Sequence, residues 1–178
     1  MSVGAVIAVE PSLGVDLEAS ATLSRLIEAA WSGGAHPILV AGSSSAAKRS
    51  PLAHYLEGTD GGDAIRVSKE IVGGTTALIH LPLSHAGVDP ETVTTLIAAH
   101  GRTPHATLRA AYHGVEGPIS LVPIAPQTGI AREETISIEC GDEGAVRPSS
   151  GSDRLGFDAP PVDSSSIDPW ERRGVEDR

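Results

Sequence analysis

Residues Val3–Ala41 read VGAVIAVEPSLGVDLEASATLSRLIEAAWSGGAHPILVA, and they are the best indicator of the fold class. The apolar run Val3–Val9 has the length and composition of a strand buried on both faces of a sheet. Apolar residues at helical spacing follow in Leu17–Ser32, and Gly33-Gly34 is a typical helix stop. A second apolar run, Pro37–Ala41, completes a strand–helix–strand unit, which predicts parallel strands with a right-handed crossover.

The rest of the chain continues this pattern of strands and helices. Four more strands are expected, at Thr76–Leu83, Thr107–Tyr112, Ile119–Ile124 and Ile136–Glu139. The middle two form a hairpin through the glycine-rich stretch HGVEGP. Asp89-Pro90-Glu91 indicates a helix start with a cap, a first-turn proline and an acid, and this helix is expected to run to about Ala99. In addition, Pro51–Glu57 is interpreted as a short helix and Ala64–Val67 as a fifth, short strand.

This order of elements predicts a single α/β domain over residues 1–178, a three-layer α/β/α sandwich around a mostly parallel sheet. Residues 148–178 are rich in Ser, Pro, Gly and Asp, so we expect a loop-rich C-terminal segment that is in part disordered. In such sheets, ligands bind beyond the carboxyl ends of the strands. The stretches to inspect are therefore Glu10–Asp16, Gly42–Ser45 and His80–His85.

Composition excludes several classes of partner. The net charge is −10, from 13 Lys and Arg against 23 Asp and Glu, which argues against nucleic acid and against an anionic membrane surface. A single cysteine, Cys140, excludes an internal disulfide and a multi-cysteine zinc site. The sequence contains neither a basic-apolar leader nor an apolar run of about 18 residues, so a cytoplasmic protein is the expectation.

Taken in order, the motifs resemble the MobA-like nucleotidyltransferases, the family that transfers a nucleoside monophosphate to molybdopterin. The resemblance rests on VIAVEPSLG, LSRLIEAAWSGGAHPILVAG, ALIHLPLSHAGVDPETVTTLIAAH, YHGVEGPISLVP and SSIDPWERR, whose order and spacing matter more than any one of them. It spans nearly the whole chain and is weakest over residues 43–74. It implies a nucleotide-diphospho-sugar-transferase-like fold and attack of an acceptor phosphate on a nucleotide α-phosphate, with Mg²⁺ if the protein is active.

The nucleotide loop departs from the family pattern G-x-S-x-R-M-G-x-x-K. Ser12 and Gly14 keep two positions and are the candidate nucleotide-binding residues that the resemblance implies. Glu10-Pro11 replaces the small residue and the glycine, which adds a negative charge and removes an amide donor. The basic residues of the motif have no counterpart at Leu13–Leu17. We therefore expect this loop to hold a triphosphate poorly.

The metal and acceptor positions are kept only in part. By alignment, His80 occupies the place of the family's metal-binding Asp, and Asp168 matches an acidic residue of the closing segment. These two are the candidate metal ligands, although Mg²⁺ prefers oxygen donors and the simpler interpretation of His80 is a turn histidine. Tyr112, Gly114 and Gly117 match the family's acceptor hairpin, although glycines also serve hairpins for backbone reasons alone.

These departures leave open whether the chain is an enzyme. The favoured hypothesis is a divergent MobA-like protein, weakly catalytic or non-catalytic, that contacts a molybdenum enzyme or a maturation protein and assists cofactor maturation. One alternative is an active Mg²⁺-dependent transferase that uses CTP or GTP with molybdopterin, with basic groups from Lys48, Arg49 or Lys69. Another is an unrelated doubly wound binding module, which would lack the hairpin at Thr107–Ile124.

Overall fold

The computed structural model describes residues 2–9, 17–42, 50–56, 74–124 and 134–149. Their strands are β1 Ser2–Ala8, β2 Ile38–Ala41, β3 Ala53–Leu56, β4 Thr75–Pro82, β5 Thr107–Tyr112, β6 Val115–Pro123 and β7 Thr135–Glu139. Their helices are α1 Leu17–Ser32 and α3 Pro90–Arg102, with the short 3₁₀ turns η1 Leu83–His85 and η2 Glu143–Ala145. Neither of the two α-helices in these residues has the length and apolar character needed to cross a bilayer.

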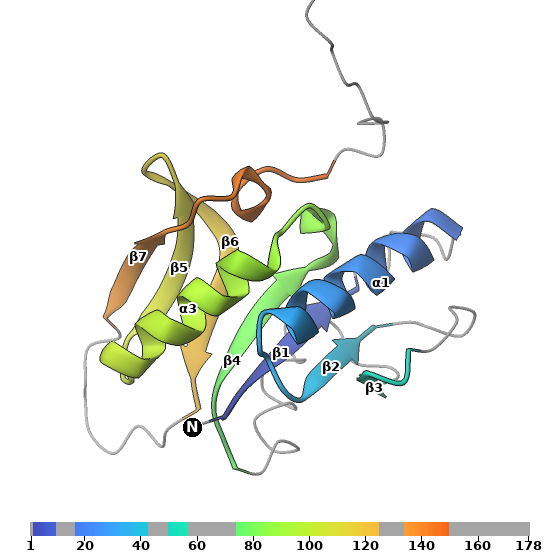
Figure 1. The fold of residues 1–178 in the computed structure, drawn as a ribbon, viewed down its shortest axis with the longest axis horizontal. Coiled ribbons are helices and arrows are strands. Elements are labelled where there is room, and N and C mark those ends of the chain that lie inside the picture. The colour runs from blue at the N-terminus through green and yellow to red at the C-terminus, as the bar shows by residue number, and fades with distance from the viewer. Residues whose placement is uncertain (1, 10–16, 43–49, 57–73, 125–133, 150–178) are drawn as a thin grey trace, which may run out of the picture.

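The seven strands form one sheet in the order β3-β2-β1-β4-β6-β5-β7. β1 pairs in parallel with both β2 and β4, β3 is parallel to β2, and β7 is parallel to β5. Only β6 is antiparallel to its neighbours β4 and β5. The prediction of an α/β fold with a mostly parallel sheet is confirmed. The carboxyl ends of β1, β4, β5 and β7 consequently lie at the same end of the sheet (Figure 1).

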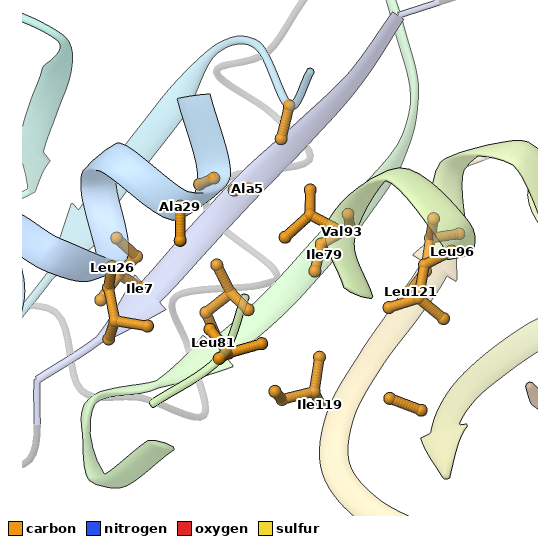
Figure 2. Packing of buried hydrophobic residues seen from close by; sticks show 14 of the residues in the cluster. Ala5, Ile7, Leu26, Ala29, Ile79, Leu81, Val93, Leu96, Ile119 and Leu121 are labelled. Atoms are coloured by element: carbon orange, nitrogen blue, oxygen red, sulfur yellow. The ribbon is translucent and has the colours of Figure 1, made fainter. Parts of the chain in front are cut away.

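The main core lies between the sheet and the two helices, which both cover the same face (Figure 1). Figure 2 shows Leu26 and Val93 from the helices packed over Ile7, Ile79 and other strand residues. The opposite face of the central strands is also buried, at Val6, Leu39, Ala41 and Leu78. These strands are therefore covered on both faces, as a three-layer arrangement requires.

Close packing of the helices depends on the glycine stop after α1. A Cβ atom at Gly33 would lie less than 3.0 Å from the Val93 side chain, so only glycine allows α3 to approach this closely. Thr94 of α3 donates its hydroxyl to the Gly33 carbonyl oxygen at 3.2 Å. Gly34 has a φ of +91°, which glycine adopts without steric cost. The helix stop predicted from this glycine pair is confirmed.

Two local predictions were wrong. Pro51–Glu57 does not form a helix, because Ala53–Leu56 is strand β3, paired in parallel with β2 along its whole length. Backbone pairing to a buried neighbour outweighs the weak local preference of these few residues. The second helix was predicted too short, because α3 continues through Gly101 to Arg102. The strand expected at Ala64–Val67 lies outside the described residues.

The hairpin at Thr107–Ile124 is present, but its turn is much shorter than the predicted HGVEGP loop. β5 ends at Tyr112 and β6 begins at Val115, which leaves only His113 and Gly114 between them. Both have positive φ, +50° and +77°, the geometry of a type I′ turn. This tight turn lets residues 115–118 join the strand, where the sequence suggested a loop.

Candidate functional site

Three structures gather at the carboxyl end of the sheet, beyond β4, β5 and β7. They are η1, the turn His113-Gly114, and the segment 140–149 that contains η2 (Figure 1). We call this assembly the carboxyl rim. In open α/β sheets this is the end at which ligands bind. The rim therefore holds the described part of the candidate site.

The turn between β5 and β6 binds a carboxylate of the chain itself. The backbone N–H groups of His113 and Gly114 both donate to the carboxylate of Glu139, the last residue of β7. The Gly114 nitrogen lies 3.3 Å from Oε2. Two convergent amides of this kind can also bind a phosphate oxygen. In this structure, however, Glu139 occupies them.

A second carboxylate, that of Asp142, joins the rim to the start of α3. Its Oδ2 accepts from the Asp89 backbone nitrogen at 2.7 Å and from the Thr92 hydroxyl at 3.1 Å. Its Oδ1 accepts from the Gly144 nitrogen at 2.7 Å. The helix start at Pro90 was predicted correctly, but the cap was not, because the Asp89 side chain makes no capping hydrogen bond. Asp142 satisfies this helix end instead.

The segment 140–149 packs tightly against the rest of the rim. The Ser149 nitrogen donates to the Ser84 carbonyl oxygen at 2.7 Å, and the Gly87 nitrogen donates to the Ser149 hydroxyl at 3.0 Å. A Cβ atom at Gly117 would lie less than 3.0 Å from the Ala145 carbonyl oxygen. The absence of a side chain at Gly117 thus allows η2 to pack against β6. At this position η2 covers the surface of β6.

His80, a candidate metal ligand, lies half-buried near the end of β4. It lies two residues beyond Leu78 on the same face of β4 and pairs in register with Val6, so its side chain belongs to the sheet face opposite α1 and α3. Burial lowers the pKa of His80, and a hydrogen bond to the Pro118 backbone opposes that effect only in part. The imidazole is therefore neutral near pH 7. A neutral nitrogen donor does not provide the hard oxygen ligands that Mg²⁺ prefers.

His85, the last residue of η1, also makes contacts within the fold. Its Nδ1 lies 3.1 Å from the Ser84 hydroxyl, and the side chain is buried. Burial lowers the pKa of His85, while a hydrogen bond to the Val146 backbone raises it. Within the described residues, no three His, Cys, Asp or Glu side chains come together as a metal site requires. The residues described here therefore do not fit an Mg²⁺ ion.

Two arginines on the nearby strands and turns are paired with carboxylates. Arg147 Nη1 lies 3.1 Å from Glu143 Oε1, one helical turn away. Arg109 Nη1 lies 3.9 Å from Glu116 Oε2 on the open face of the sheet. All four side chains are about half exposed, so these pairs are weak and screened by salt.

The structure therefore brings together part of the predicted site. Tyr112 and Gly114 flank His113 at the rim, and the Tyr112 ring meets the His113 ring edge-on at 4.2 Å. Gly117 lies three residues further along β6, beneath Ala145. The predicted residues Ser12, Gly14 and Asp168 lie outside the described residues. Sequence reasoning missed the roles of Glu139 and Asp142 at the rim.

Comparison with known proteins extends this description. No protein-family model and no curated protein matches the sequence. Solved structures do match. The manganese complex of Rv0371c from Mycobacterium tuberculosis H37Rv is similar over 78% of this chain and 88% of that chain, with a TM-score of 0.58 and 15% identity. The 2-C-methyl-D-erythritol 4-phosphate cytidylyltransferase from Thermus thermophilus is similar over 85% and 94%, with a TM-score of 0.54 and 16% identity. The 4-diphosphocytidyl-2C-methyl-D-erythritol synthase from Anaerococcus prevotii is similar over 84% and 93%, with a TM-score of 0.58 and 8% identity.

At these identities the likeness defines the fold. The chain has the nucleotide-diphospho-sugar-transferase-like fold that the resemblance implied. The hairpin whose absence would have favoured an unrelated doubly wound module is present as β5 and β6. Function on a shared fold depends on the residues of the site, which for this chain are those of the carboxyl rim and of the loop after β1.

Proposed function

We propose that this chain is a nucleotidyltransferase-fold protein with weak or no catalysis, which acts through protein contacts in the maturation of a molybdenum enzyme. One observation carries the first part: the amides at the rim that could bind phosphate are bound to the chain's own carboxylates. Glu139 occupies the amides of His113 and Gly114, and Asp142 occupies the Asp89 amide at the start of α3.

The electrostatic consequence is unfavourable for a nucleotide. A phosphoryl-transfer site needs donors and cations that neutralise the phosphates and the developing charge. A phosphate entering the turn at His113 would have to displace Glu139 or lie beside it. Two like charges about 4 Å apart cost about 1–4 kcal/mol, depending on the effective dielectric. The neighbouring Arg109 and Arg147 are each already paired with a carboxylate.

The sequence of the first loop supports the same conclusion. Glu10-Pro11 places a negative charge and a missing amide donor directly after β1, at the position where the family has a glycine-rich turn. The molybdenum part of the proposal rests on the ordered resemblance to MobA-like proteins. Molybdopterin and a molybdenum enzyme or its maturation protein are therefore the partners that we propose.

The direct test is nucleotide binding to the full chain. We expect CTP, GTP and ATP with Mg²⁺ to leave the unfolding free energy unchanged. A ligand with a Kd of about 10 μM, present at about 1 mM, would raise it by about 2.7 kcal/mol, which a thermal-shift or urea experiment detects easily. A stabilisation of that size would overturn the proposal.

A matched pair of variants tests the role assigned to Glu139. Glu139→Ala removes the carboxylate that occupies the turn amides, whereas Glu134→Ala removes an exposed carboxylate just before the same strand. Both change the net charge equally. We expect Glu139→Ala to bind inorganic phosphate more tightly than Glu134→Ala, seen as shifts of the His113 and Gly114 amide resonances. An equal response of the two variants would show that Glu139 does not exclude phosphate.

Two assays address catalysis and maturation. Pyrophosphate release from CTP or GTP with molybdopterin and Mg²⁺ should not exceed the uncatalysed rate, and sustained turnover would establish the active transferase instead.

For maturation, a molybdenum enzyme purified without its cofactor is incubated with molybdopterin and molybdate, with and without this chain. We expect the chain to raise the yield of active enzyme. An unchanged yield would remove the molybdenum part of the proposal.

A further inference from the structure

Strand β7 is the last strand of the sheet in the described part of the chain, and no other described strand pairs with its outer edge (Figure 1). The Thr107 nitrogen donates to the Glu134 carbonyl oxygen at 2.9 Å, and the Cys140 nitrogen donates to the Ala111 carbonyl oxygen at 2.8 Å. The even-numbered residues of this segment thus turn their backbone groups toward β5. Because the direction alternates along a strand, the odd-numbered residues of β7 turn their N–H and C=O groups outward.

Several of the usual protections of an outer strand are missing from β7. Such strands are commonly guarded by lysine, proline, a bulge or an inward-pointing charge. The sequence TISIE contains no lysine or proline, and its pairing with β5 is regular throughout. Its polar side chains reach back over the sheet instead. The Ser137 hydroxyl donates to Glu116, and Glu139 binds the amides of the β5–β6 turn. Within Thr135–Glu139, the outward backbone groups are therefore left without a lysine, a proline or a bulge beside them.

We propose that the outer edge of β7 pairs with β7 of a second copy of this chain, antiparallel and centred on Ser137. A two-fold axis at Ser137 places each Ser137 opposite its counterpart as a hydrogen-bonded pair. Thr135 then lies opposite Glu139 of the second copy, at both ends of the paired segment. The outward N–H and C=O groups of these three residues make six backbone hydrogen bonds across the axis.

Side-chain chemistry favours this register over its neighbours. On the helix side of the sheet, half-buried Ile136 lies opposite Ile138 of the second copy, which covers two apolar side chains. On the opposite face of the sheet, each Glu139 lies opposite Thr135 of the second copy. The two Glu139 carboxylates are therefore separated by four residue positions along the paired strands. A shift of the axis toward the end of the strand would bring these like charges together, which destabilises a strand pair. The occupant that best fits this edge is therefore an identical strand. This inference goes beyond the proposed function and does not depend on it.

Molar mass is the first measurement. The full chain has a mass of 18.2 kDa, and light scattering after size-exclusion chromatography should give twice this value at high protein concentration, with dissociation on dilution. Ser137→Pro removes the central outward N–H of each copy, yet proline is tolerated where the N–H faces away from the sheet. We expect this variant to be a monomer with an unchanged circular dichroism spectrum. Ser137→Ala loses the hydroxyl but keeps the N–H, and it should remain a dimer.

Cross-linking tests the register itself. In the proposed pair, the two residues at position 137 have Cα atoms about 5.5 Å apart, within the range that a disulfide spans. The residues at position 135 are about 14 Å from their counterparts. Ser137→Cys should therefore form a covalent dimer on mild oxidation, and Thr135→Cys should not. The native Cys140 is buried and does not interfere.

The outcomes are distinguishable. A wild-type monomer at every concentration overturns the proposal. So does a dimer that survives Ser137→Pro, because it would use another surface. Efficient cross-linking of Thr135→Cys in place of Ser137→Cys would also overturn the register. A change of molar mass would be seen whether or not the chain binds nucleotide, so failure here is separate from failure of the proposed function.

Discussion

His100 is a buried imidazole whose removal should stabilise the protein. It lies in the last turn of α3 with 1% of its surface exposed, and within the described structure neither ring nitrogen has a hydrogen-bond partner. An unpaired buried polar group costs about 1–3 kcal/mol. Leucine has a comparable size and a higher helix propensity. We therefore expect His100→Leu to raise the unfolding free energy by about 1–3 kcal/mol near neutral pH.

The effect should grow in acid, and the sign follows from the direction of the pKa shift. Burial lowers the pKa of His100, and the nearby His105 lowers it further. The unfolded chain, with an ordinary histidine pKa of about 6.5, then binds a proton that the folded chain does not. Stability is fully present above about pH 6.5 and declines as the pH falls below it. At about pH 5.8 one such histidine costs the wild type up to about 1 kcal/mol, which His100→Leu does not lose.

The assay is urea unfolding followed by circular dichroism, at about pH 7.8 and about pH 5.8. His80 and His85 also have pKa values lowered by burial, but they are present in both proteins and cancel in the difference. His54→Leu provides the matched control at an exposed position of β3. The reasoning is refuted if His100→Leu is less stable than wild type at the higher pH. It is also refuted if the difference between the two proteins does not increase on acidification.

Two further predictions concern packing and capping at the rim. Gly117→Ala should lower the unfolding free energy by about 1–3 kcal/mol, because the new Cβ meets the Ala145 carbonyl oxygen. The control Gly101→Ala, in open space on α3, should raise the unfolding free energy by up to about 1 kcal/mol. Equal responses of the two variants in thermal denaturation would contradict this. Asp142→Ala should lower the unfolding free energy measured in urea by about 2 kcal/mol, because three donors lose their acceptor. The control Glu143→Ala removes the same charge and should lower it much less. A comparable decrease in both variants would assign the effect to charge alone.

Much of the fold could be predicted because its strands are buried on both faces. The run Val3–Val9 corresponds to β1, Ser2–Ala8, and the helix at Leu17–Ser32 was placed with its correct bounds. Continuous apolar runs bounded by glycine carry this information locally. Strand β3 was missed because it has only four residues, and its pairing with β2 was not visible in the local pattern. The two-residue turn at His113-Gly114 was missed because its glycine-rich surroundings also suit a longer loop.

The candidate site was less predictable because its key contacts join distant segments. Glu139 is 26 residues from His113, and Asp142 is 53 residues from the helix start that it caps. An acidic residue at the end of a short strand, or a few residues beyond it, carries no local signal of either role. The expected cap was assigned to Asp89, the nearest acidic residue to Pro90, because nearby residues are the only candidates that a sequence pattern can offer.

The long reach of Asp142 also bears on how the molecule is made. During synthesis, the first turn of α3 is complete 50 residues before Asp142 is added, since Thr92 and Asp142 are separated by that interval. At about 5–20 residues per second, the ribosome takes about 3–10 s to supply this carboxylate. During that interval β5, β6 and β7 are also synthesised, and the start of α3 still lacks the carboxylate that later caps it. This contact of the rim can therefore form only after all seven described strands have been synthesised, and a release of the chain before Asp142 would leave α3 uncapped.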